Sequence, residues 1–205
     1  MFAELTQKKP SSENDNAADG RHSRTIATRK RIVAGFIDLI AEGIVSPTAE
    51  QVALRAGIGL RTVFRHFDDM ETLYREVGTH VSMLIDQVLQ TQLKAPDWQG
   101  KLVESIEIRA PLFEKLMPFH IASHVYRHAS PFVEKYIHQL HMLECTILQI
   151  ILPSTILKDK PRFEALVQAL SNDAWVRLRR EQKLTRKQAT EVMQLAAEAL
   201  TTIKG

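Results

Sequence analysis

Four polar side chains within one short stretch could recognise a nucleic acid. Arg61, Thr62, Arg65 and His66 alternate with apolar residues at helical spacing, so a helix over residues 60–67 would present them together on its outer face. Arginine can form two hydrogen bonds with the edge of a guanine, and threonine can bond a phosphate or contact a thymine methyl group. These residues are therefore candidates for contacting DNA.

A run of histidines is the second chemically active group. His120, His124 and His128 are spaced four apart, and His138 and His141 follow at a spacing of three. Neutral imidazoles along one helix face can bind zinc, nickel or copper. No carboxylate or second thiol has an evident partner role in the sequence. The favoured interpretation is that these histidines lie at the surface or line an ordinary interface, so no metal and no other cofactor is predicted.

The elements that would position the DNA-facing stretch form a helix-turn-helix. A helical apolar pattern over residues 25–43 is followed by Thr48 and Gln51, whose spacing fits a capping box at the start of a short helix. The glycines in residues 57–59 favour a sharp turn before the helix over residues 60–67. The packed side of this unit is expected to consist of Ala53, Ala56, Ile58, Val63 and Phe67.

The rest of the chain is predicted to be helical, giving an all-α fold. Asp68, three residues before Glu71, is the expected cap of a long helix that continues to Val88. The predicted domains are a disordered tail over 1–22, a DNA-binding domain over 23–85 with its helix-turn-helix at 48–67, and a helical ligand-binding and dimerisation domain over 86–205. The later helices are expected to be separated by Pro111, Pro118, Pro131, Pro153 and Pro161.

Two amphipathic segments end the chain, over residues 161–182 and 185–203. Their apolar residues recur at intervals of three and four, which leaves a face that a second copy of the pair could cover. The sequence therefore predicts a homodimer built on a four-helix interface. The apolar residues of this pattern are Phe163, Leu166, Leu170, Val192, Leu195 and Leu200.

Charge and composition narrow the function classes. The net charge of the 205-residue chain is only +3, but residues 21–67 hold eight Arg or Lys against three acidic residues, whereas residues 68–205 hold 17 of each. Such a basic segment is typical of a surface that meets a phosphate backbone, the alternative being a solvated basic face. No apolar run reaches the roughly 18 residues of a membrane span, no secretory signal is readable, and the single Cys145 is expected to be a buried, inert thiol. We expect a cytoplasmic protein.

The segments 32–42, 52–58 and 62–67, followed by 71–73, resemble the tetracycline-repressor (TetR) family of transcription regulators in order and spacing. The resemblance covers residues 25 to about 77. It implies a homodimer that binds a palindromic operator, usually as a repressor, and that a small-molecule effector releases. The rest of the chain matches only in helical architecture.

Individual DNA contacts follow from the same resemblance. Thr48 matches the family's cap that often meets phosphate, and Thr62 and Phe64 match the Thr and Tyr that usually touch the backbone. Phe64 lacks the hydroxyl of that tyrosine, so one phosphate hydrogen bond is missing. Leu60 and Arg61 replace a common basic residue and a common small one, which suggests a particular base preference.

The sequence also offers candidate residues for binding a small molecule, but no motif of an enzyme. Arg109, His124, Tyr126 and Arg127 are the candidates for polar contacts to a small molecule within an otherwise apolar pocket. No Gly-rich phosphate loop, nucleophile turn or zinc-protease signature is found, so the chain is not expected to be an enzyme. The alternative to a regulator is a ligand-binding or protein-interaction module of the same fold that has lost specific DNA binding.

Overall fold

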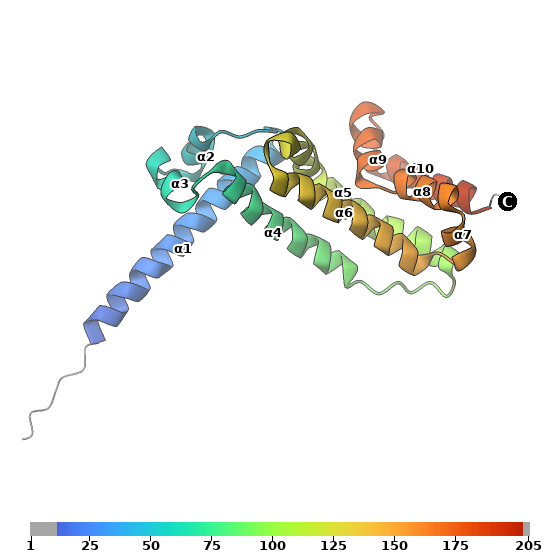
Figure 1. The fold of residues 1–205 in the computed structure, drawn as a ribbon, viewed down its shortest axis with the longest axis horizontal. Helices are drawn as coiled ribbons and strands as arrows, with labels where there is room; N and C mark the ends of the chain where they lie inside the picture. Colours follow the sequence, from blue (N-terminus) through green and yellow to red (C-terminus); the bar gives the residue numbers. More distant parts are fainter. Residues whose placement is uncertain (1–11, 203–205) are drawn as a thin grey trace, which may run out of the picture.

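The computed structural model describes residues 12–202, with side chains from His22 onward, and this part of the chain is helical and contains no strand (Figure 1). The predicted all-α fold is therefore confirmed. A 3-10 turn over Arg127–Ala129 and a π turn over Arg177–Glu181 supplement the α-helices. The α-helices are α1 Ser12–Ala41, α2 Ala49–Ala56, α3 Leu60–His66, α4 Met70–Leu89, α5 Trp98–Tyr126, α6 Pro131–Ile151, α7 Ser154–Lys158, α8 Lys160–Ala169, α9 Asn172–Val176 and α10 Arg186–Thr202. None of these helices is long and apolar enough to cross a membrane.

The start of the first helix differs from the prediction. The sequence predicts disorder over residues 1–22, but α1 already begins at Ser12. A helix that packing has nucleated extends cheaply, because each further residue adds one backbone hydrogen bond. Ile32, Phe36 and Ile40 supply that packing, since all three are almost fully buried. The part of the predicted tail over residues 1–11 lies outside the described residues.

Local capping signals set the ends of the short helices. The Thr48 hydroxyl accepts from the Gln51 backbone N–H at 3.3 Å, and the Gln51 side chain accepts from the Thr48 backbone N–H at 2.9 Å, which confirms the capping box. Gly57 ends α2 in the left-handed conformation. At the start of α4 the prediction was one residue off, because Asp69 rather than Asp68 accepts from Thr72 N–H at 2.7 Å. Both aspartates lie before the helix, and only tertiary placement distinguishes them.

Three of the five prolines separate helices as predicted, because Pro131 begins α6, Pro153 precedes α7 and Pro161 lies in the first turn of α8. The other two do not. Pro111 and Pro118 both lie inside α5, which runs unbroken for 29 residues. A proline inside a helix removes one backbone hydrogen bond and costs about 3 kcal/mol. The buried side of α5, which includes Leu102, Ile106 and Phe113, offsets this cost because each fully buried side chain contributes about 1.5 to 3 kcal/mol.

The predicted helix over 161–182 is interrupted. Helix α8 ends at Ala169, and the Ser171 hydroxyl caps α9 by accepting from Ala174 N–H at 3.0 Å. The break also turns the backbone N–H of Asn172 toward Glu144 of α6, which accepts from it at 2.8 Å. A serine that can satisfy a free N–H competes with continued helix, and here the cap prevails.

The molecule has two apolar cores, and both include residues of α5 and α6. One joins α1 to α4 with parts of α5 and α6. The other joins α5 and α6 to α7–α10. Figure 1 shows α2 and α3 at one end and α8–α10 at the other, with α4, α5 and α6 between them. The predicted boundary at 85/86 falls inside α4, so one continuous helix connects α3 to the middle of the molecule.

Replacing Gly57 is expected to destabilise the turn between α2 and α3. Its φ is +62°, and an L residue in this region costs about 1 to 2 kcal/mol. Gly57→Ala should lower the free energy of unfolding by about that amount in urea denaturation. Gly59→Ser is the matched control, because Gly59 has an extended φ of −74° at the start of α3 and serine is preferred there. Equal losses in both variants would contradict this role of Gly57.

Candidate nucleic-acid interface and ligand cavity

Helix α3 buries one side and leaves the other open. Val63 and the following Phe67 are each only 2% exposed. Arg61 and Arg65 are exposed, and neither forms a hydrogen bond or ion pair with any residue that the structure describes. Phe64, 48% exposed, lies on the same open side. Helix α3 therefore has a packed side and an outer side, as the sequence predicts.

The two remaining polar residues of α3 are partly covered. Thr62 and His66 are half-buried. The carbonyl of His66 accepts a hydrogen bond from Arg29 of α1 at 2.7 Å. Burial lowers the pKa of His66, and the charges of Arg65 and Arg29 lower it further, so its side chain is neutral at neutral pH. His66 can offer hydrogen bonds to a ligand but no positive charge.

Several basic residues of segment 21–67 hold helices α1 to α4 together, and these helices are called the head of the molecule here. Besides its bond to His66, Arg29 pairs with Glu76 at 2.9 Å and lies over the Phe67 ring at 4.2 Å from its centroid. Arg31 donates to the Ala56 carbonyl at 2.6 Å and so covers the end of α2. A positive charge at a helix C-terminus is favourable. The basic excess in the sequence is therefore partly structural, and not all of it is available to a phosphate backbone.

Arg55 is also used within the protein and is not free for a phosphate, because it forms two hydrogen bonds with Glu42 at 2.6 and 2.7 Å. Thr48, by contrast, is exposed at the start of α2. Its oxygen accepts from Gln51, and its O–H lowers the pKa of the neighbouring Glu50 carboxylate. A phosphate at this helix N-terminus would take the place of that carboxylate, because the hydroxyl and the N–H groups suit an anion.

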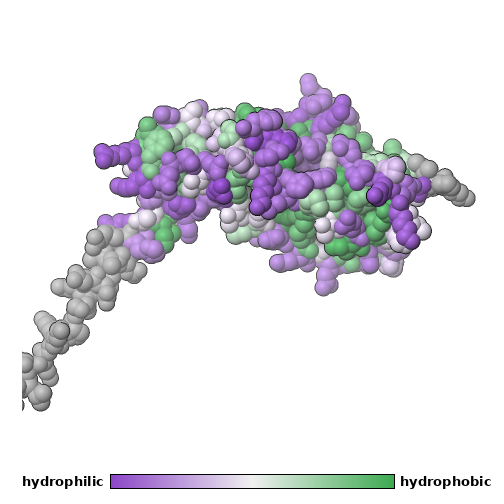
Figure 2. Space-filling view, viewed as in Figure 1, coloured by the Kyte–Doolittle hydropathy of each residue, from purple (hydrophilic) through white to green (hydrophobic). Residues whose placement is uncertain are grey.

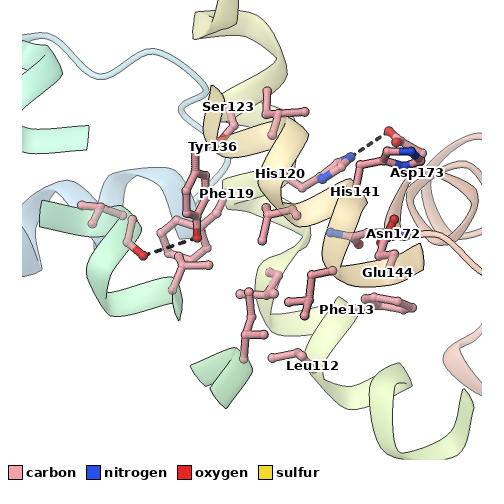
Figure 3. A pocket seen from close by; sticks show the side chains of 18 of the residues that line it. Leu112, Phe113, Phe119, His120, Ser123, Tyr136, His141, Glu144, Asn172 and Asp173 are labelled. Atoms are coloured by element: carbon pink, nitrogen blue, oxygen red, sulfur yellow. Dashed lines mark hydrogen bonds and ion pairs between the residues drawn. The ribbon is translucent and has the colours of Figure 1, made fainter. Parts of the chain in front are cut away.

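A cavity lies between α4, α5 and α6, and α9 closes one end (Figure 3). It leaves about 110 Å³ for the centres of water-sized molecules. One water requires roughly 10 to 15 Å³ of such space, so the cavity has room for a small organic molecule. Most of its lining is apolar, and this part includes Val77, Val81, Leu112, Phe119, Phe132 and Leu140.

One end of this cavity is polar. Arg109 is 5% exposed and donates to the carbonyls of Ser105 at 3.1 Å and Leu170 at 3.2 Å. Burial lowers its pKa to about 10, so it stays charged at neutral pH. The side-chain oxygen of Asn172 is buried and has no hydrogen-bond partner among the described residues. Because buried polar atoms are normally satisfied, this oxygen indicates a place for a donor group of a ligand.

The predicted ligand-binding residues are not brought together. Of the four, only Arg109 lines the cavity. Tyr126 stacks on Tyr74 with ring centroids 4.2 Å apart, and Arg127 forms two hydrogen bonds with Glu134. His124 lies outside the lining, next to His120, which belongs to it.

Sequence reasoning missed Glu144, which lies at the polar end of the cavity in an otherwise apolar stretch of α6. Burial raises its pKa above the ordinary value of 4.5, against the opposing effects of Asn172 and Arg109. A lone carboxylate within the apolar run 140–152 was the signal that could have identified it.

Glu144 should make stability depend on pH. Because the folded protein holds this proton more tightly than the unfolded chain, the stabilisation is present below pH 4.5 and is lost as the pH rises through the folded-state pKa. Glu144→Gln removes the effect, so the stability of the variant relative to the parent should increase from about pH 4 to neutral pH. Urea denaturation across this range measures the difference.

The control for this test is Glu134→Gln, because Arg127 lowers the pKa of Glu134. Here the parent loses stability as the pH falls below about 5 toward the lowered folded-state pKa. The variant should therefore become less stable relative to it as the pH rises through this lower range, and the difference should not change further toward neutral pH. A pH-independent difference for Glu144→Gln would contradict its burial as a carboxylic acid.

The histidines are placed differently from the prediction. Helix α5 ends at Tyr126, so His128 lies in the following 3-10 turn rather than on the face of His120 and His124. Those two rings lie with centroids 4.3 Å apart. His120 bonds Asp173 of α9 at 2.8 Å (Figure 3). The structure thus supplies the carboxylate partner that the sequence did not reveal.

The other side chains of this region follow expectation. His138 and His141 are exposed, with ring centroids 6.5 Å apart. Cys145 is buried, as predicted, and its pKa is raised by burial. A thiol that holds its proton is a poor nucleophile and a poor metal ligand.

The sequence matches no protein-family model and no curated protein. Among solved structures, the chain is similar to a transcriptional regulator from Rhodococcus sp. Rha1, with a TM-score of 0.64 and 15% sequence identity. The similarity covers 84% of this chain and 95% of that chain. The chain therefore shares the all-helical fold of a transcriptional regulator. The resemblance to the tetracycline-repressor family remains a prediction.

Proposed function

We propose that this protein is a DNA-binding transcription regulator that binds a palindromic operator as a homodimer, acts as a repressor and is released by a small molecule. The observation that carries the proposal is the open side of α3. There two arginines without protein partners among the described residues stand on a helix whose other side is fixed by burial of Val63 and Phe67. A helix of this kind fits the major groove, which is about 12 Å wide.

The contacts divide into base recognition and positioning. Arg61 and Arg65 reach base edges, with Leu60 and Phe64 in apolar contact beside them. Thr48 and Thr62 bond phosphates and so set the orientation of α3. His66 is neutral and contributes a hydrogen bond at the end of the helix. Arg29 holds α3 against α1 and α4, so a movement of α4 would move the whole interface.

The second copy of the chain would cover α10. Val192 is 40% exposed and Leu195 66% exposed, and Figure 2 shows apolar surface, drawn in green, on the C-terminal half of the molecule. Leu166 and Leu170 cannot contribute to this interface, because they are almost fully buried within the chain. A twofold axis between paired α10 helices would relate the two α3 helices symmetrically, as a palindrome requires.

The effector would occupy the cavity between α4, α5 and α6. Its apolar body would contact these helices, and a polar group would reach Arg109 and Asn172. Residues of α4 from Tyr74 to Leu89 line this space, and α4 follows α3 after only three residues. A ligand that favours a different position of α4 would lower operator affinity, provided that it binds that position more tightly.

The test compares two variants that lose the same charge at opposite ends of the molecule. Arg61→Gln/Arg65→Gln changes α3, and Arg177→Gln/Arg180→Gln changes exposed arginines near α9. Binding of the full-length protein to sheared genomic DNA is measured over a range of salt concentrations. The α3 variant should bind more weakly, because two positive charges beside the duplex are lost. Its log–log slope should fall by about 0.9 for each of these arginines that rests on a phosphate when the DNA lacks the specific site.

The control variant should match the parent protein in both affinity and slope. If both variants bind DNA equally well, α3 is not the interface. If the parent protein shows no salt-dependent DNA binding, the proposed regulator function fails, and a ligand-binding module without DNA binding takes its place.

A further inference from the structure

We propose that His120, His124 and Asp173 form a binding site for a divalent transition-metal ion, with zinc the best match. The site joins α5 to α9 at the polar end of the cavity (Figure 3). The proposal concerns these side chains alone and is independent of DNA binding.

The spacing of the three ligand atoms suits one ion. They all lie within 4.8 Å of one another. Asp173 Oδ1 is 2.8 Å from His120 Nε2 and 3.8 Å from His124 Nε2. Around tetrahedral zinc, with bonds of roughly 2.0 to 2.2 Å, two ligand atoms are about 3.4 Å apart. Rotations that move the ends of these side chains by up to about 1 Å would therefore complete the geometry.

An unsatisfied atom points to the same site. His124 Nε2 is buried and has no hydrogen-bond partner among the described residues, which is costly for a polar atom. An ion between His124 and Asp173 would satisfy it. Asp173 is exposed, its side chain having 62% of its surface open, so an ion can reach the site from solvent.

The charges around the cluster are compatible with a cation. Arg127 is the cation that faces His124 and Asp173 from the end of α5, but it already forms two hydrogen bonds with Glu134. The carboxylate of Glu134 thus offsets the positive charge of Arg127 near the site.

The donor set determines the class of metal. Two imidazole nitrogens and one carboxylate oxygen favour zinc, cobalt, nickel or copper over magnesium and calcium, which prefer oxygen ligands alone. Three protein ligands leave a fourth position free. Because His120 and Asp173 also line the cavity, an oxygen or nitrogen of a cavity ligand could take that position.

The test is titration of the metal-free, full-length protein with Zn²⁺, read by equilibrium dialysis and by the metal-dependent rise in melting temperature. One ion per chain is expected. His124→Gln and Asp173→Asn should each weaken binding at least about tenfold, since even residues that only support metal ligands change affinity 10- to 100-fold. Co²⁺ should show visible absorption typical of tetrahedral coordination, which both variants lose. Mg²⁺ should not raise the melting temperature.

The matched control is His80→Gln/His138→Gln, which removes two exposed histidines that do not line the cavity and should leave Zn²⁺ binding unchanged. Thermal unfolding without metal verifies that each variant is folded. Loss of binding in the control together with unchanged binding in His124→Gln would overturn the site in favour of exposed histidines elsewhere. Absence of stoichiometric Zn²⁺ in the parent protein would overturn it altogether, whatever the result with DNA.

Discussion

Arg65→Ala should weaken binding to a specific operator by about 1 to 3 kcal/mol, roughly 5- to 150-fold, while binding to unrelated DNA changes less. The physical reason is that an arginine paired with a guanine edge makes contacts that a wrong base cannot provide. Arg65 is suited to this because it is exposed and has no protein partner in the described structure. Fluorescence anisotropy with both kinds of duplex, at one salt concentration, measures the two affinities.

The control for Arg65 is Arg55→Ala, on the neighbouring helix. Arg55 already pairs with Glu42, so its removal should affect both kinds of DNA only slightly. If Arg65→Ala instead weakens binding to all sequences by the same factor, Arg65 contacts phosphate and base recognition belongs to another residue.

Trp175→Ala should lower the free energy of unfolding by about 3 to 5 kcal/mol, a large part of the 5 to 15 kcal/mol typical of a folded domain. Trp175 is completely buried and packs against Phe113 at 5.9 Å between ring centroids. Its indole N–H donates to Glu114 at 2.9 Å. Alanine would leave a large void between α5 and α9. Urea denaturation measures the loss.

Trp175→Phe separates the ring from its hydrogen bond. Glu114 keeps its two bonds from Arg179, at 2.6 and 3.0 Å, so the lost hydrogen bond alone should cost about 1 kcal/mol. The phenylalanine variant should therefore retain most of the stability. A loss below about 1.5 kcal/mol for Trp175→Ala would contradict the structural role of this residue.

The head of the molecule was predictable because its signals are local. The capping box of Thr48 and Gln51 and the left-handed Gly57 each act within four residues along the chain. Their positions therefore indicate the α2–turn–α3 unit from neighbouring residues alone. What the sequence could not show is that Arg29 and Arg31 are used inside the head, since their partners come from other helices.

The C-terminal half was less predictable because long-range packing determines it. Burial of one face keeps α5 helical through Pro111 and Pro118, against their local preference. His120 and Asp173 are 53 positions apart in the sequence, and only the docking of α9 on α5 brings them together. The cavity likewise joins Arg109, Glu144 and Asn172 from three helices, a grouping that no spacing along the chain indicates.

Selection of genomic DNA fragments by the purified full-length protein, with competitor DNA at fixed salt followed by sequencing, tests the proposed function most directly. We expect one palindromic motif with half-sites whose centres are about 34 to 36 Å apart, or a multiple of that distance. Fragments carrying this motif should disappear from the selection when Arg65→Ala replaces the parent protein. Recovery of no motif above background would contradict the proposal that α3 reads DNA.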